Sequence, residues 1–285
     1  MVARVPNPSP ELACVVFSLR AQPELAEAAR SAQEQDVPVE LVVVNSGGGD
    51  AAGVLARAGV GGVPVVELGA PALPGAARNA GVRATNAPYV AFLEADCIAE
   101  PGWAAARLAA HRAGAGAVAS VMTCAPPARA ASYASLLLLH NRRLPDTPPE
   151  RRLHYGLSFR RSLLDDAGPF REDVRAGEDT DLRERINGSA TIVWAPDVRT
   201  AHRYPSGARA LLADQFARGA RRARSAPGSA RGVARNALVD IGACVRAARD
   251  APDPHERRRR TGALPLLPAG AAAYAVGALL AEVRR

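Results

Sequence analysis

Two acidic residues, Glu94 and Asp96, follow a short apolar run that begins at Tyr89. The run predicts a buried β-strand, and residues i and i+2 of a strand point to the same face of its sheet. The two carboxylates are therefore expected to converge beyond the carboxyl end of a strand, which is where open α/β sheets bind ligands. A divalent cation that carries a diphosphate takes few protein oxygens and keeps positions open for phosphate. The pair is a candidate site for such a cation, and the alternative is a solvated strand end.

The elements that must position this pair alternate between strands and helices. Apolar runs predict strands at 12–18, 39–44, 63–68, 89–93, 118–122, 155–159 and 190–194. Helical spacing or helix-start signals predict helices at 23–35, 51–58, 101–112 and 161–167, and another from 177. This β-α-β alternation with short connections predicts an α/β fold with a doubly wound, mostly parallel sheet. Residues 74–81 are interpreted as a loop entering a helix, and the proline- and arginine-rich residues 126–152 as a long functional loop.

The positive charge of the chain is concentrated at one end. The net charge is +8 over 285 residues, and the stretch from residue 206 onward holds fifteen arginines against six acidic residues. We therefore expect a nearly neutral domain over 1–205 and a basic, helical extension over 206–285. A basic tail favours an anionic partner, either a membrane surface or nucleic acid. The tail has no zinc-ligand spacing and few aromatic residues, which argues against nucleic acid.

The extension contains amphipathic or apolar stretches suited to a membrane. Helices are expected at 208–224 and 232–248, and residues 261–281 carry no charge. About 20 apolar residues suffice to span a bilayer, but the prolines and glycines here leave three interpretations open: a span, an interfacial helix pair or a soluble helical cap. Residues 1–10 have no apolar core, so no signal peptide is expected. The four widely spaced cysteines fit reduced thiols and a cytoplasmic location.

Four more polar segments follow or precede the predicted elements in a recurring order. They are Asn45-Ser-Gly-Gly-Gly-Asp50, Ala77-Arg-Asn-Ala-Gly81, Gly177-Glu-Asp-Thr-Asp-Leu182 and the late residue His202, accompanied by Ala167-Gly-Pro-Phe-Arg-Glu172. Each also has a structural interpretation. Asn79 and Asp179 are suited to helix capping, Arg78 to a solvated helix face, and His202 to a hydrogen-bonded core histidine.

Taken together, the order and spacing of these segments resemble the family-two inverting glycosyltransferases of the GT-A fold, over about residues 12–204. The resemblance implies a nucleoside-diphosphate sugar donor, a hydroxyl acceptor, and Mg²⁺ or Mn²⁺. It implies that Asp179 is the catalytic base and that Glu178 positions it or binds the acceptor. Asp96 and His202 would be the metal ligands. The implied donor-binding residues are Asn45, Asp50, Arg78, Asn79 and Glu94.

Two positions depart from the family pattern. Asn45 stands where the family usually has an aspartate that hydrogen-bonds the nucleotide base, and Asn keeps an acceptor but adds a donor, which leaves open whether the family's usual preference for uracil holds. Glu94 replaces the first aspartate of the usual Asp-x-Asp pair, with one more methylene. These departures favour one alternative, a degenerate GT-A domain that acts as a scaffold. A nucleotidyltransferase is a second alternative, but residues 18–23 lack the glycine-rich loop it would carry.

The sequence therefore predicts a metal-dependent inverting glycosyltransferase with a C-terminal membrane-associating extension. Its acceptor would be a lipid-linked, cell-envelope or secondary-metabolite glycan. The basic helices would hold it peripherally at the inner face of the cell membrane, on an anionic surface. No nucleic-acid partner is expected.

Overall fold

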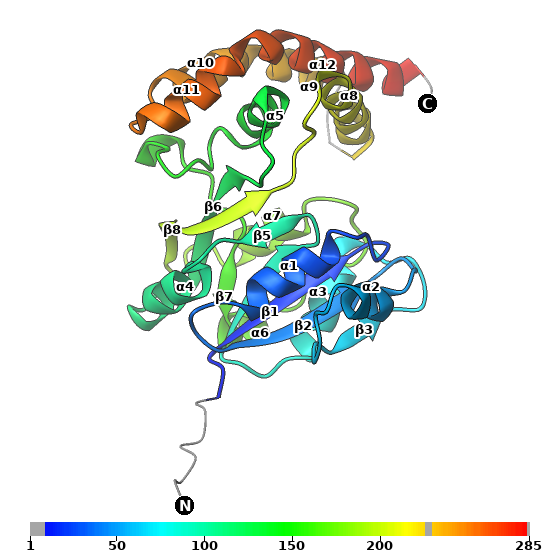
Figure 1. Ribbon diagram of the computed structural model, residues 1–285, viewed down its shortest axis with the longest axis vertical. Helices are drawn as coiled ribbons and strands as arrows, with labels where there is room; N and C mark the ends of the chain where they lie inside the picture. The colour runs from blue at the N-terminus through cyan, green and yellow to red at the C-terminus, as the bar shows by residue number, and fades with distance from the viewer. Residues whose placement is uncertain (1–8, 226–229, 284–285) are drawn as a thin grey trace, which may run out of the picture. The chain divides into compact units, whose positions relative to one another are not determined.

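The computed structural model describes residues 9–225 and 230–283 (Figure 1). Most of the segment 1–10, for which no signal peptide is expected, lies outside the described residues. The chain divides into two compact units, one formed by Met1–Val121 with His154–Thr200 and the other by Met122–Leu153 with Ala201–Arg285. The second unit thus takes residues 122–153 in addition to the predicted extension, whose start at residue 206 stays a prediction.

Four parallel strands form the part of the sheet that carries the first polar segments. They are β1 (Leu12–Ser18), β2 (Val39–Asn45), β3 (Val65–Glu67) and β4 (Tyr89–Glu94). β1 pairs in parallel with both β2 and β4, and β2 pairs in parallel with β3. The side chains of residues 12–16 are fully buried, as expected for a parallel strand covered on both faces. The predicted α/β fold is confirmed.

The complete sheet is mixed, with eight strands in the order β3-β2-β1-β4-β7-β6-β8-β5. The other four strands are β5 (Cys97–Ala99), β6 (Ala117–Cys124), β7 (Ser158–Arg160) and β8 (Ile192–His202). β7 runs antiparallel to β4 and to β6. The sequence did not indicate β5, which has three residues, and the predicted strand at 190–194 is wrong in extent. β8 continues to His202, because its exposed polar residues interrupt the apolar pattern without interrupting the strand.

Helices flank the sheet of the first unit (Figure 1). They are α1 (Leu25–Gln33), α2 (Ala51–Arg57), α3 (Pro74–Arg83), α4 (Trp103–Arg112), α6 (Arg161–Ala167) and α7 (Glu178–Arg185). The predicted helix after a loop at 74–81 is present, but the loop part of that prediction is wrong, because α3 already begins at Pro74, a residue tolerated in a first helical turn. Gly81 explains how closely α3 packs on β1. A Cβ added there would lie 2.1 Å from Cγ1 of Val15.

A buried histidine, His111 of α4, is held in its neutral form. Its ring stacks on Tyr89 with centroids 4.4 Å apart. Nδ1 lies 3.0 Å from the Ala115 carbonyl oxygen and so carries the proton, while Nε2 lies 2.9 Å from Ser158 Oγ and accepts from it. Burial lowers the pKa of His111 to about 4, with the backbone bond to Ala115 opposing the shift. Protonation of this ring is therefore disfavoured in the folded protein.

Lowering the pH should reduce the free energy of unfolding, because His111 is neutral in the folded protein and is protonated more readily in the unfolded chain. The lowered pKa means that its contribution to stability is fully present above pH 6.5 and is lost as the pH falls towards about 4. In His111→Gln this loss is absent. The difference in unfolding free energy between wild type and variant should therefore narrow by about 2–3 kcal/mol from about pH 7 to about pH 4. Urea titrations across this range measure the difference, and a constant value would contradict the assignment.

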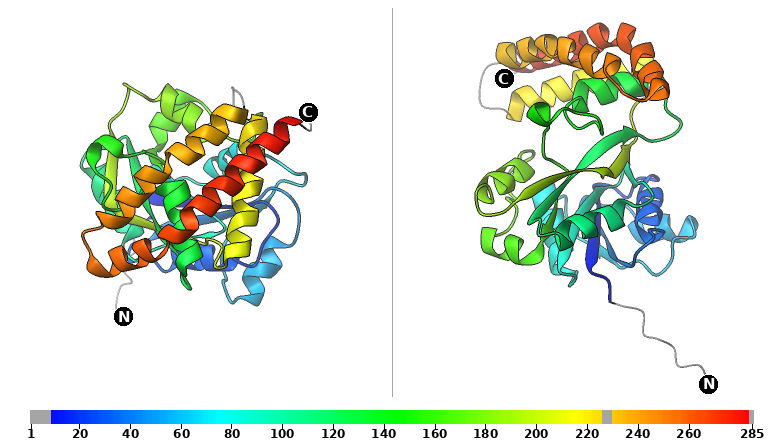
Figure 2. Two further views of the ribbon diagram at one scale, coloured as in Figure 1. Left: turned by 90° about the horizontal axis from the view of Figure 1, so that it is seen from above. Right: turned by 90° about the vertical axis from the view of Figure 1, so that its left-hand side faces the viewer.

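Helices make up most of the second unit, and Figure 2 shows them packed together. They are α5 (Ala130–His140), α8 (Ala208–Ser225), α9 (Ala230–Val239), α10 (Ile241–Arg249), α11 (Pro254–Gly262) and α12 (Leu267–Val283), with 3₁₀ turns at Pro149–Arg151 and Leu264–Leu266. The prediction that 126–152 is one long loop is wrong, because α5 lies within it. Its leucines Leu136 and Leu137 are buried in the core of this unit.

Two glycines allow α8 and α12 to pack with their backbones in contact. A Cβ added at Gly277 would lie 2.1 Å from the carbonyl oxygen of Phe216, and one added at Gly219 would lie 1.9 Å from that of Tyr274. Backbone atoms cannot move aside as a flexible side chain would. Any larger residue at either position therefore forces the two helices apart.

Gly277→Ala should destabilise the second unit by about 1–3 kcal/mol, the usual cost of overpacking a close contact. Gly242→Ala in α10 is the matched control, since the nearest atom to its added Cβ is the end of the flexible Arg246 side chain, 3.7 Å away. That control should be neutral or stabilising, because alanine favours a helix by about 1 kcal/mol over glycine. Thermal unfolding followed by circular dichroism compares the two. Equal melting temperatures for both variants would show that α8 and α12 do not pack as described.

One helical stretch among the described residues has the length and composition to cross a membrane. It runs over Pro254–Ala281, 28 residues, with a mean hydropathy of 1.7 in its most apolar window. Only 39% of that window is buried. Composition alone does not separate a spanning helix from one that packs in a soluble fold.

Candidate active site

The two candidate cation ligands lie at the carboxyl end of β4. Glu94 is the last residue of the strand and is exposed, whereas Asp96 lies in the turn that leads to β5. The prediction that both share one strand face is wrong, because β4 ends at Glu94. The turn brings them together instead: ligand atoms of Glu94, Asp96 and the neighbouring Cys97 lie within 4.8 Å of one another.

The chemistry of these groups fits a hard cation. Carboxylate oxygens are the ligands that Mg²⁺ and Mn²⁺ prefer, and a thiol is not. Cys97 is buried, and its Sγ lies 3.8 Å from Asp96 Oδ1, to which the thiol donates. Cys97 therefore supports the Asp96 carboxylate. The two carboxylates remain as the oxygen donors for a metal.

His202 is the last residue of β8 and belongs to the second unit. Within that unit its ring stacks on Tyr204 with centroids 4.4 Å apart, and the Tyr204 hydroxyl lies 2.7 Å from Nδ1 of His140. Burial lowers the pKa of His140 well below its usual range, so His140 is neutral and its ring is hydrogen-bonded to the Tyr204 hydroxyl. His202 is thus buried in a fixed orientation, and its role as a ligand stays a prediction.

A buried ion pair joins α3 to the start of α7. Arg78 Nη1 donates to Glu178 Oε1, and both residues are less than one-tenth exposed. Three aromatic rings surround the guanidinium, with centroids 4.8–5.8 Å from Cζ, and they belong to Phe17, Phe92 and Phe170. Such a cation–π arrangement and a carboxylate partner together offset the cost of burying the charge. The solvated helix face considered for Arg78 is excluded.

Replacing Arg78 alone should lower the free energy of unfolding much more than replacing Arg78 and Glu178 together. Arg78→Met leaves the Glu178 carboxylate buried without its cation, and we expect a loss of about 3–5 kcal/mol in unfolding free energy. Adding Glu178→Gln to that variant removes the unpaired charge and should recover most of the loss. Chemical denaturation of the two single variants and the double variant gives the coupling energy. If the losses in unfolding free energy of the two single variants simply added in the double variant, the pairing of Arg78 with Glu178 would be contradicted.

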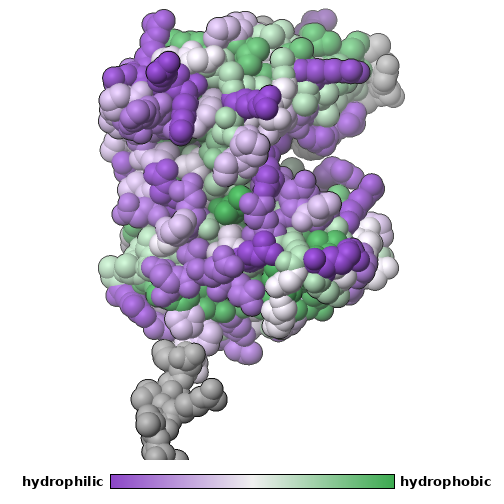
Figure 3. All heavy atoms as spheres, viewed as in Figure 1, coloured by the Kyte–Doolittle hydropathy of each residue, from purple (hydrophilic) through white to green (hydrophobic). Residues whose placement is uncertain are grey.

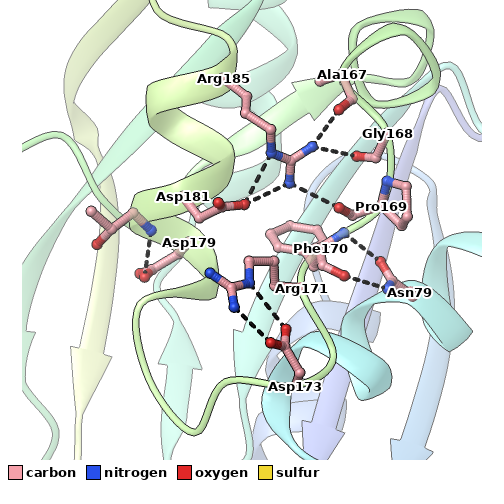
Figure 4. Close-up of polar contacts among 11 residues, drawn as sticks. Asn79, Ala167, Gly168, Pro169, Phe170, Arg171, Asp173, Asp179, Asp181 and Arg185 are labelled. Atoms are coloured by element: carbon pink, nitrogen blue, oxygen red, sulfur yellow. Dashed lines mark hydrogen bonds and ion pairs between the residues drawn. The ribbon is translucent and has the colours of Figure 1, made fainter. Parts of the chain in front are cut away.

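Asp179 follows Glu178 in the first turn of α7 and stays partly exposed. Its Oδ1 accepts a hydrogen bond of 2.8 Å from the backbone N–H of the next residue, Thr180 (Figure 4). The Thr180 hydroxyl in turn lies 2.8 Å from the Tyr155 hydroxyl. Gly177 precedes the pair with a φ of 99°, a conformation that favours glycine. The turn is therefore held by Glu178 on one side, while the Asp179 side chain stays partly exposed.

Asn79 fastens the loop that leads into α7. Its side-chain amide accepts from the Phe170 N–H at 2.9 Å and donates to the Phe170 carbonyl oxygen at 2.9 Å (Figure 4). A further hydrogen bond of 2.8 Å reaches Glu172. Asn79 lies in the middle of α3, so the N-cap interpretation is wrong. Its role in donor binding stays a prediction.

The glycine-rich segment after β2 packs against the loop after β1. A Cβ at Gly47 would lie 2.0 Å from the Leu19 carbonyl oxygen, so this glycine permits contact between two loops. Asn45 is buried at the end of β2. Asp50 caps α2, accepting from the Gly53 N–H at 2.7 Å, and forms an exposed ion pair with Arg57. The predicted donor-binding roles of Asn45 and Asp50 stay predictions.

Several residues near these groups were not indicated by the sequence. Glu67 ends β3 beside Asn45, and a polar residue at the carboxyl end of a strand was a signal that could have found it. His140 and Tyr204 had no such signal, since they are 64 residues apart and meet only through folding.

Residues 14–162 match the family model for glycosyl transferase family 2, just over half of the 285 residues. The chain belongs to glycosyl transferase family 2. The predicted recognition is thereby confirmed, and the chain is a glycosyltransferase. A search of curated proteins gave no match.

Solved structures with similar folds are GT-A glycosyltransferases. The mannosyltransferase PcManGT from Pyrobaculum calidifontis, in complex with GDP-Man and Mn2+, is 22% identical with a TM-score of 0.55, over 96% of this chain and 75% of that one. S. aureus TarS 1-349 in complex with UDP-GlcNAc is 16% identical with a TM-score of 0.53, over 96% and 90% of the two chains. At these identities the similarity establishes the GT-A fold of this family 2 enzyme.

Proposed function

We propose that this family 2 glycosyltransferase transfers a sugar from a nucleoside diphosphate to a hydroxyl acceptor, with inversion at the anomeric carbon and with a divalent metal. The observation that carries the proposal is the gathering of Glu94 and Asp96 at the carboxyl end of β4. A family member needs hard oxygen ligands at that place to hold the diphosphate of its donor.

The proposed donor site extends along the carboxyl edge of the parallel strands. Asp96 and His202 would hold Mg²⁺ or Mn²⁺, and Glu94 would contact the donor ribose or the water shell of the cation. When bound, the cation offsets negative charge that grows on the leaving diphosphate. The other proposed donor-binding residues are Asn45 and Asp50 after β2, and Arg78 and Asn79 of α3.

Asp179 is the proposed base. The acceptor hydroxyl gives its proton to the Asp179 carboxylate while its oxygen forms a bond to C1 of the sugar. The bond between C1 and the diphosphate oxygen breaks with its electrons, and the nucleoside diphosphate leaves on the opposite side. A base must lie within hydrogen-bond reach of the hydroxyl, and the partly exposed carboxylate of Asp179 is suited to this. Glu178, fixed by Arg78, positions the turn that presents it.

The test is turnover of nucleotide sugars. The purified protein is incubated with GDP-, UDP- and dTDP-sugars and simple hydroxyl acceptors, with Mn²⁺ or with EDTA. We expect metal-dependent release of one nucleoside diphosphate, and proton NMR of the product should show the anomeric configuration opposite to that of the donor. Retention of configuration would refute the inverting mechanism. Full activity in EDTA would refute the metal requirement.

We further propose that the acceptor is lipid-linked and that the second unit binds an anionic membrane surface at the cytoplasmic face. Five exposed apolar side chains support this, on two helices that pack against each other: Leu212 and Phe216 of α8, and Val276, Leu279 and Leu280 of α12. Exposed apolar area appears in the second unit beside hydrophilic side chains in Figure 3. Arginines on α8 and α11 supply charge for anionic lipid headgroups.

Vesicle co-sedimentation tests the membrane proposal. The full-length protein should pellet with phosphatidylglycerol vesicles and much less with phosphatidylcholine vesicles. The double variant Val276→Asp with Leu280→Asp should stay in solution. Ala52→Asp, an exposed change on α2, is the control and should pellet like wild type. Wild-type protein that stays soluble with both vesicle types would refute the proposal.

A further inference from the structure

A carboxylate and an amide lie side by side at the carboxyl ends of β3 and β2. Glu67 and Asn45 are register partners in the parallel ladder. Asn45 Nδ2 donates to Glu67 Oε2 at 2.7 Å. Asn45 is only 1% exposed, whereas Glu67 is exposed. Of the two side chains, Glu67 is therefore the one that a ligand can reach.

The Asn45 amide is engaged in holding the surrounding backbone. Its Oδ1 accepts from the Ala21 N–H at 3.1 Å, and its Nδ2 also donates to the Gly48 carbonyl oxygen at 3.0 Å. Ala21 has a φ of 48°, which costs a non-glycine residue energy and needs such support. Both amide hydrogens of Asn45 are thus used within the protein. Asn45 therefore shapes the donor site by fixing its loops and by holding the Glu67 carboxylate that faces a ligand.

An aspartate at position 45 could not replace this asparagine while Glu67 is present. Aspartate has no N–H to give to Gly48 or to Glu67, and its charge would lie against the Glu67 carboxylate in the same place. Asparagine at 45 and glutamate at 67 therefore form a matched pair. The carboxylate at this end of the sheet comes from β3 rather than from β2.

Glu67 lies at the right place along the sheet to meet the base of a bound nucleotide. The strand order is β3-β2-β1-β4, with the carboxylates Glu94 and Asp96 at the end of β4. Three strand spacings, about 14 Å in total, separate β4 from β3. A nucleoside diphosphate whose phosphates lie at β4 extends along this edge and brings its base to β2 and β3. The segment after β3 is tied to β2 by the Ala72 N–H, which donates to the Ser46 carbonyl oxygen at 2.7 Å.

The chemistry of a carboxylate selects among the bases. Ionised glutamate only accepts hydrogen bonds. Guanine presents two adjacent donors, N1–H and the N2 amino group, which match the two oxygens of a carboxylate. Uracil presents a single N–H and can therefore give a carboxylate one hydrogen bond where guanine gives two, and adenine and cytosine each present one amino group beside a ring-nitrogen acceptor. We propose that Glu67 reads the base of the donor and selects a guanine nucleotide, an inference that rests on the proposed donor site.

Calorimetric titration of GDP, UDP, ADP and CDP in the presence of Mn²⁺ tests this selection. Wild-type protein should bind GDP at least about tenfold more tightly than the other three, since a bidentate pair discriminates between bases by about ten- to one-hundred-fold. Glu67→Gln keeps an oxygen that accepts from Asn45 but loses the second acceptor. It should lose most of the preference for GDP, with its affinity for UDP changed by less than about threefold.

Glu34→Gln is the control, because it makes the same change of charge at an exposed position at the end of α1. It should bind every nucleotide as wild type does. Tighter binding of UDP than GDP by wild type, or an unchanged GDP preference in Glu67→Gln, would overturn the role of Glu67 and leave the proposed function intact. Binding of no nucleotide by wild type with Mn²⁺ would overturn the proposed function and this inference together.

Discussion

Asp96→Asn is expected to lower kcat/KM for sugar transfer by about 10²–10³-fold. The reason is that Asp96 supplies an oxygen for the cation that offsets charge on the leaving diphosphate, and removing one such electrostatic contact has an effect of this size. Asparagine keeps the shape of the side chain and one oxygen acceptor for the Cys97 thiol. The fold should therefore be preserved. Initial rates at several Mn²⁺ concentrations measure the loss, which more metal should only partly restore.

Asp36→Asn is a matched control for this change, since Asp36 is exposed and distant in sequence from the site. It should retain wild-type activity and wild-type metal dependence. If Asp96→Asn keeps more than about half of the wild-type rate, the metal site is not where we place it. A folded wild-type protein without any transferase activity would instead support the alternative of a degenerate GT-A domain that acts as a scaffold.

Asp179→Asn is expected to reduce kcat by about 10²–10⁴-fold while leaving donor binding nearly unchanged. General-base catalysis contributes a factor of this order, and the amide that replaces the carboxylate cannot take the acceptor proton. The side-chain oxygen can still accept the Thr180 N–H, so the turn and the melting temperature should hold. Steady-state kinetics together with calorimetry of the nucleoside diphosphate separates the chemical step from binding.

The neighbouring Asp181→Asn tests whether charge loss alone explains the effect. Asp181 is on the same helix and forms an ion pair with Arg185 four residues on, at 2.9 Å (Figure 4). Its replacement should lower kcat by less than about threefold, because an exposed pair of this kind contributes about 0.3–0.5 kcal/mol. Equal losses in the two variants would mean that Asp179 acts through the acidity of the helix start and is not the base.

Much of the first unit was predictable because local patterns and tertiary packing agree there. The apolar runs that predict β1, β2 and β4 are the strands that pair in parallel. The sequence placed α5 wrongly in a loop for a physical reason. Seven of its eleven residues are buried, so it lacks the amphipathic period that marks a surface helix. The flanking prolines reinforced the wrong interpretation.

The sequence indicated which residue types belong to the candidate site, but it did not indicate which of those residues contact one another. Glu94, Asp96 and Asp179 stand out because acids follow a strand or begin a helix. The pairing of Arg78 with Glu178 joins residues 100 positions apart, and no local pattern reports such a contact. The same holds for Asn45, whose type departs from the family pattern. Its three hydrogen bonds to Ala21, Gly48 and Glu67 explain the departure only once the fold is known.

The most direct test of the central claim is metal-dependent nucleotide binding at Asp96. Calorimetric titrations of GDP, UDP and dTDP into wild type and Asp96→Asn, each with and without Mn²⁺, provide it. We predict that wild type binds at least one nucleotide only with Mn²⁺, and that Asp96→Asn binds it at least about tenfold more weakly with Mn²⁺ and not at all without it. Metal-independent binding, or binding that the Asp96 variant retains in full, would contradict a metal-held donor at the end of β4.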